Sequence, residues 1–212
     1  RDASAVEWPG WSRSERDEAS ALQALCDYGG RYASVMRLAR LEFQPPGDVS
    51  AFNVIERVEG NATTDFGTPG MACVRDSEPV NDIQLDRFQA LLKACWEAFD
   101  QARRAATGKE LRKGPRGGGR DLEKIVEHVV GADGAYLKQL GFKVKLPEAT
   151  NLEDGLARFR QAILESIATA VHGGVPELGP RGGKRWTARY FVRRSAWHVL
   201  DHTWEIEDRI GG

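Results

Sequence analysis

The chain of 212 residues is long enough for one large domain or two small ones with a substantial core. Hydrophobic residues make up 41% and charged residues 29%, as in ordinary soluble globular proteins. The formal net charge of -1 argues against charge-driven binding to nucleic acid or to an anionic membrane. The sequence contains no apolar run of about 18 residues, which predicts that no helix spans a membrane.

The cysteines and the N-terminal stretch predict a cytoplasmic protein. Cys26, Cys73 and Cys95 are an odd number without a CxxC pair, which favours reduced thiols. Cys95 lies in an apolar helical stretch, so we expect it to pack in the core. The first residues, RDASAVEWPGW, lack the apolar segment of a signal peptide.

The first part of the chain predicts short elements of both kinds. Residues 3–11 (ASAVEWPGW) favour a strand that runs into a Pro-Gly turn. Residues 17–39 have helical spacing of apolar positions, with a break at Gly29-Gly30. Residues 52–60 (FNVIERVEG) alternate as a strand does, and residues 61–82 are rich in turn residues. We therefore expect a small α/β unit over residues 1–80.

The rest of the chain predicts four long helices. From Asp82 onward, apolar residues recur at the helical period, and further helices are expected over residues 121–141, 151–174 and 187–210. Basic, glycine-rich segments precede the second and the fourth helix. Four long helices with glycine-rich connections are typical of a four-helix bundle, here over residues 82–212. The predicted fold class is therefore α+β, mainly α.

Three of the four histidines suggest a metal site. His198 and His202 are four residues apart, so they project from one face of the last helix, as a pair of metal ligands does. His128 lies in the second helix beside small residues and is the natural third ligand. His172 is at a helix end, where it suits the helix dipole. The alternative is that the histidines are polar groups of the core or the surface.

The histidine pattern resembles the DinB-like superfamily, which includes YfiT-like proteins and the mycothiol- and bacillithiol-dependent transferases. His128 and the stretch AWHVLDHTWEI match the places of the metal ligands in that family, over roughly residues 82–210. The segment VEWPGWSRSERDEASALQAL also resembles part of a HicB-like unit. Many DinB-like proteins have Trp-Ser before the second helix, where this chain has KGPRGGGRD, so the family's substrates do not carry over.

This resemblance implies a divalent metal, usually zinc or nickel, held by His128, His198 and His202. It also implies activation of a low-molecular-weight thiol that attacks a small electrophile. Asp201 and Glu205 are candidate catalytic residues, as acceptors that orient the histidines or as a base; the alternative is a solvated helix face. We expect Trp197 to pack against a neighbouring helix.

Basic side chains suggest an anionic substrate. Arginines and a lysine lie in the two glycine-rich segments, and Arg194 lies one turn before His198. Glycine-rich backbone before a helix can bind an anion, provided that both segments lie at the metal end of the bundle. The residues in these segments are Arg116, Arg120, Arg181, Lys184 and Arg185. The alternative is that the segments are solvated connectors.

Three functions are open at this point. The first is a metal-dependent thiol transferase or hydrolase, and the second is a non-catalytic metal or small-molecule binder. The third is a structural bundle without a metal. A homodimer fits the resemblance, while nucleic-acid binding is disfavoured except through the HicB-like unit.

Overall fold

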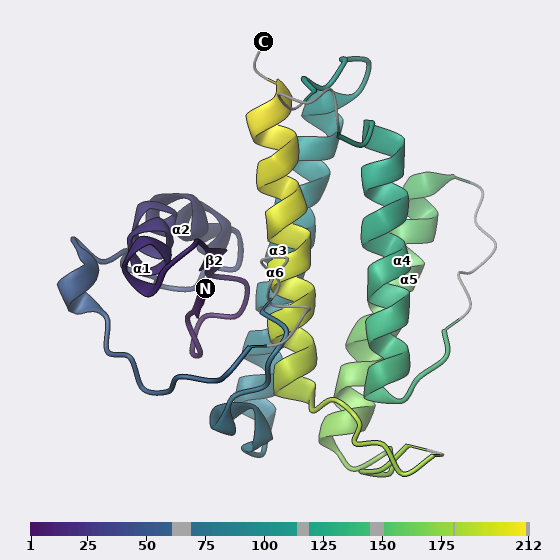
Figure 1. The fold of residues 1–212 in the computed structure, drawn as a ribbon. Helices are drawn as coiled ribbons and strands as arrows, with labels where there is room; N and C mark the ends of the chain where they lie inside the picture. Colours follow the sequence, from purple (N-terminus) through teal and green to yellow (C-terminus); the bar gives the residue numbers. More distant parts are fainter. Residues whose placement is uncertain (61–68, 114–118, 145–150, 180, 211–212) are drawn as a thin grey trace.

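The computed structural model describes residues 1–60, 69–113, 119–144, 151–179 and 181–210. Over these ranges the chain is mainly helical, with six α-helices and one two-stranded antiparallel sheet. Four long helices stand side by side, and a smaller N-terminal unit lies against one side of them (Figure 1). The mainly helical expectation is confirmed.

Each of the four predicted long helices is present. They are α3 (Asp82–Ala106), α4 (Leu122–Leu140), α5 (Leu152–Val171) and α6 (Ala188–Ile210). Polar side chains cap three of their starts: Asn81, Asp121 and Asn151 each accept a hydrogen bond from the backbone N–H three residues on. α4 ends at Gly141, whose φ of +118° lies in the left-handed region that glycine tolerates.

Helix α6 is the most enclosed of the four. It packs against α3 and α4, and its apolar side chains Phe191, Val199 and Leu200 are fully buried. Burying each such side chain contributes about 1.5–3 kcal/mol to the stability of the folded state. Within the described residues, none of the helices is long and apolar enough to cross a membrane.

The N-terminal unit consists of a hairpin and two short helices. β1 (Asp2–Ser4) pairs with β2 (Ser12–Ser14), and α1 (Glu18–Asp27) and α2 (Gly29–Leu38) follow. The break between the helices was predicted. The strand expected over residues 3–11 is shorter than predicted, because the Trp-Pro-Gly stretch forms the loop between β1 and β2.

The prediction of a strand over residues 52–60 is wrong. A 3₁₀ turn, η1 (Val49–Ala51), precedes this stretch, which has no regular secondary structure. A strand needs a neighbour for its backbone hydrogen bonds, and in the described part of the chain the only sheet is the hairpin β1–β2, with which this stretch does not pair.

An ion pair holds the linker before α3 against α6. Residues 69–81 were predicted as loop and contain one short 3₁₀ helix, η3 (Val74–Ser77). Asp76 of η3 forms a buried ion pair with Arg193, whose Nε donates to the carboxylate over 2.9 Å. The predicted loop residues 61–68 lie outside the described residues.

The buried apolar side chains form one cluster that includes both the N-terminal unit and the bundle. In the N-terminal unit, Trp11 stacks on Tyr32, with 5.8 Å between ring centroids, and its indole N–H donates to the carbonyl of Leu25. In the bundle, Cys95 is fully buried, as expected for a packing role, and burial raises the pKa of its thiol.

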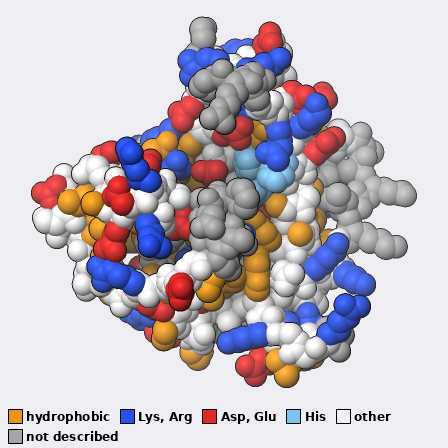
Figure 2. Space-filling model, in the orientation of Figure 1, with side chains coloured by type: hydrophobic (Ala, Val, Ile, Leu, Met, Phe, Trp, Pro, Cys, Tyr) orange, Lys and Arg blue, Asp and Glu red, His pale blue; other side chains and the backbone are white. Residues whose placement is uncertain are grey.

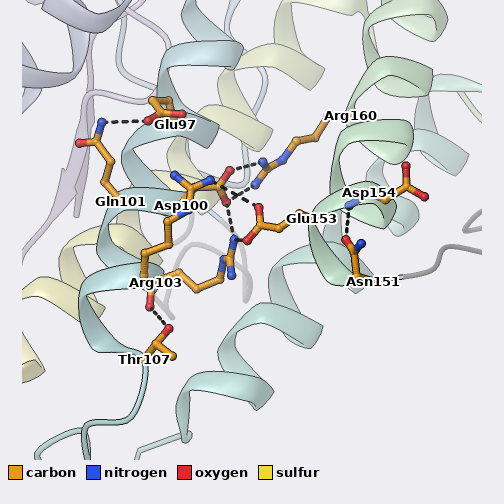
Figure 3. A network of polar contacts seen from close by, with 10 residues as sticks. Glu97, Asp100, Gln101, Arg103, Thr107, Asn151, Glu153, Asp154 and Arg160 are labelled. Carbon is orange, nitrogen blue, oxygen red and sulfur yellow. Dashed lines mark hydrogen bonds and ion pairs between the residues drawn. The ribbon is translucent and has the colours of Figure 1, made fainter.

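A polar network joins α3 to α5 (Figure 3). Arg160 donates two hydrogen bonds to the buried carboxylate of Asp100, over 2.6 and 3.0 Å. Nearby, Arg103 pairs with Glu153 at the start of α5. These contacts fix the position of α5 without involving the histidines.

Candidate metal centre

Helices α4 and α6 bring the three candidate ligands together. His198 and His202 lie one turn apart on α6, and His128 faces them from α4. One nitrogen of each ring lies within 4.8 Å of a nitrogen of each other ring. The three histidines are therefore close enough to bind one metal ion, as the sequence predicted.

Two of the ligand atoms are close to the spacing that a bound ion requires. The Nε2 atoms of His128 and His198 are 3.1 Å apart, and the three ring centroids are 4.7–4.9 Å apart. Zinc–nitrogen bonds of about 2.0–2.1 Å place tetrahedral ligand atoms about 3.3 Å apart. Small side-chain movements would suffice to seat an ion.

The surroundings favour the neutral form of two of the imidazoles, those of His198 and His128. Burial lowers the pKa of His198 to about 2, helped by the neighbouring histidines and by the charges of Arg194 and Arg120. Burial and the charge of Arg120 also lower the pKa of His128. A neutral imidazole is the form that binds a metal. In Figure 2 histidine side chains gather at one place on the surface, next to basic side chains.

Glu205 orients one of the three rings. Its Oε2 lies 2.7 Å from Nδ1 of His202, which leaves Nε2 of that ring for an ion. Its other oxygen accepts a hydrogen bond from Arg209 over 2.6 Å. The hydrogen bond from His202 lowers the pKa of Glu205, so the carboxylate is ionised. Of the two roles considered for Glu205, this geometry favours the orienting one.

Asp201 is directed toward the N-terminal unit. It forms an ion pair with Arg13 over 3.2 Å, and its side chain is 42% exposed. Asp201 and Glu205 both line a surface cavity of about 230 Å³ between α6 and the N-terminal unit. The rest of its lining is Arg13, Tyr28, Trp204 and Asp208.

The two basic, glycine-rich segments lie at opposite ends of the bundle (Figure 1). The first lies at the C-terminal end of α6, where Arg209 donates to the carbonyl of Arg120. The second leads into the N-terminal end of α6. The condition set for anion binding, that both segments lie at the metal end of the bundle, is therefore not met. Arg120 itself lies close enough to lower the pKa of two histidines, and Arg116 lies outside the described residues.

His172 is apart from the centre, as expected. It caps the end of α5, and its Nε2 lies 3.0 Å from a carboxylate oxygen of Asp82 at the start of α3. Both side chains are exposed.

Sequence reasoning missed the aromatic surroundings of the centre. The ring centroid of Tyr136 is 5.8 Å from that of His198, and the ring of Trp197 is 5.9 Å from it. Trp197 is half-buried beside the histidines rather than packed in the core. The signal was the position of Tyr136 eight residues after His128, since that spacing places both on related faces of one helix.

Comparisons of this chain with known protein families, with curated proteins and with solved structures give no match.

Proposed function

We propose that this chain is a DinB-like, metal-dependent enzyme that activates a thiol or a water molecule for attack on a small electrophile. The observation that carries the proposal is the convergence of three imidazoles from α4 and α6 on one point, where burial lowers the pKa of His128 and of His198. A divalent ion held by three histidines keeps a position for a thiol or water and lowers the pKa of the group bound there.

The residues of the chain have distinct parts in this proposal. His128, His198 and His202 hold zinc or nickel, and Glu205 fixes the ring orientation of His202. Arg120 contributes positive charge near the histidines, which favours an anionic thiolate or substrate.

A metal-binding protein without catalysis is the second candidate. It is favoured by the state of the two carboxylates that sequence analysis named as possible bases: Glu205 is bonded to His202 and Arg209, and Asp201 is paired with Arg13. An enzyme that activates a thiol at a metal can work without a separate base, because the ion itself favours the thiolate.

Turnover by the metal-loaded protein distinguishes these functions. The zinc- and nickel-loaded chain would be incubated with cysteine or glutathione and an activated aryl halide, and with an activated ester to test for hydrolysis. We expect product formation that is lost in His198→Ala and kept in His172→Ala, since His172 is distant from the centre. A loaded protein with no turnover above the metal-free protein would support the non-catalytic binder.

A further inference from the structure

Arg194 is a buried cation enclosed by aromatic rings, one turn before His198 on α6. The residue is only 6% exposed. Its guanidinium carbon lies 5.2 Å from the ring centroid of Tyr136, 5.3 Å from that of Trp197 and 5.7 Å from that of Trp186. The rings partly compensate the buried charge, but they supply no hydrogen-bond acceptor in the plane of the guanidinium.

Most of the donors of Arg194 are unused. Its Nη2 makes one long hydrogen bond, 3.3 Å, to the hydroxyl of Tyr136, while Nε and Nη1 are buried without a partner. Buried donors without partners cost free energy, so such groups in a native protein point to a ligand or a functional role.

A nitrogen of the histidine centre is in the same state as these donors, since Nδ1 of His198, one turn along α6, is also buried without a partner among the described residues.

The distance between Arg194 and the three histidines suits a small molecule that contacts both. Arg194 and His198 are four residues apart on α6, which corresponds to a rise of about 6 Å. Tyr136 and Trp197 contact both of them, so the arginine and the histidines share one set of aromatic neighbours.

The charges facing Arg194 are few. Among the described residues, no carboxylate lies within ion-pair distance of its guanidinium, although the charge of Arg194 acts on Asp2 of β1. Asp133 lies on α4, one turn before Tyr136. One planar cation suits a monoanion better than a phosphate dianion.

We propose that Arg194 and Tyr136 form a carboxylate-binding subsite beside the three-histidine centre, so that the molecule bound is a small carboxylic acid. Its carboxylate pairs with the planar edge of Arg194, in the bidentate geometry that arginine favours, and its other end reaches the metal. The inference rests on the proposed function and names its substrate class.

Binding of matched small ligands tests the subsite. The zinc-loaded protein would be titrated with glycolate and benzoate and with the neutral amides of the same shape, followed by calorimetry and by the fluorescence of Trp186 and Trp197. Arg194→Met removes the charge, and Arg194→Lys keeps it without the planar fork. Arg189→Met, on the same helix but bonded to the linker before α3, is the matched control. Circular dichroism and zinc content would be measured for every variant.

We expect the carboxylates to bind at least about tenfold more tightly than the amides, and Arg194→Met to remove this preference with zinc content unchanged. Arg194→Lys should keep part of it, and Arg189→Met all of it. Equal binding of acids and amides, or an undiminished preference in a folded Arg194→Met protein, would overturn the subsite. If the wild type holds no zinc, the proposed function fails separately, and the same acid-to-amide comparison on metal-free protein still decides the role of Arg194.

Discussion

At the scale of single residues, the candidate metal centre includes a carboxylate that contacts one of its histidines, Glu205. Glu205 holds Nδ1 of His202 and is itself held by Arg209, so the ring is fixed with Nε2 free. Replacing Glu205 by Gln should weaken metal affinity about 10- to 100-fold, because a neutral amide orients the ring less strongly and makes it less basic.

Competition with a chromophoric chelator measures this affinity. Glu207→Gln is the matched control, because Glu207 lies on the same helix but pairs with Arg31 and is 46% exposed. Equal affinities for the two variants would show that Glu205 does not support the site.

The residues of the centre could be predicted only in part from the sequence. The spacing of His198 and His202 fixes their common face, since a helix turns about 100° per residue. No local pattern relates His128 to them across 70 residues, so its assignment depended on its position in a helix beside small residues, to which the family resemblance was added. The aromatic rings around Arg194 come from α4, α6 and the segment before α6, and only tertiary packing brings these residues together.

At the scale of elements, helix α4 places a buried carboxyl group, that of Asp133, inside the bundle. Asp133 is 4% exposed, and burial raises its pKa to about 7, against the opposing charge of Arg160. The folded state therefore binds a proton more tightly than the unfolded state, whose carboxyl has the ordinary pKa of 3.8. Stability due to this proton is complete below that value and is lost as the pH rises through 7.

Asp133→Asn removes this dependence on pH. The variant should gain stability relative to the wild type as the pH rises from 4 to 7, by at most about 1.4 kcal/mol per pH unit, and the gain should level off above pH 7. Urea unfolding at pH 5, 6, 7 and 8 measures it. A constant difference between the two proteins over this range would contradict a raised pKa.

The long helices were predictable because their signals are local. Asp121 and Gly141 mark the ends of α4 in the sequence, and the structure shows them as its caps. The prediction of a strand over residues 52–60 was wrong because the alternation of apolar and polar residues does not show whether a neighbouring strand is available to pair with it. The two glycine-rich segments lie at opposite ends because α4 and α6 run in opposite directions, with Arg120 before α4 bonded to Arg209 near the end of α6. A bundle in which every consecutive pair of helices is antiparallel would place both segments at one end, and the sequence carries no local signal of the departure from that order.

At the scale of the whole molecule, the N-terminal unit and the bundle share one buried apolar cluster. Gly10 lies at this junction, with a φ of +93°, and an added Cβ would come within 3.0–3.1 Å of Leu200 and Ala196 of α6. Gly10→Ala should therefore lower the free energy of unfolding by about 1–3 kcal/mol, through both backbone strain and crowding.

The same experiment tests whether the chain unfolds as one unit. Far-ultraviolet circular dichroism and tryptophan fluorescence should give coincident transitions in both Gly10→Ala and the wild type. The control is Gly30→Ala, which meets no neighbouring atom and should be neutral or stabilising. A variant in which one signal changes well before the other would show two independent units.

The measurement that tests the central claim most directly is the metal content of the untagged protein, by plasma mass spectrometry after incubation with zinc and with nickel. We predict about one equivalent of metal in the wild type and in His172→Ala, and loss of that metal in His198→Ala and His128→Ala. A wild type without metal, or a His198→Ala protein that keeps a full equivalent, would contradict a three-histidine metal centre.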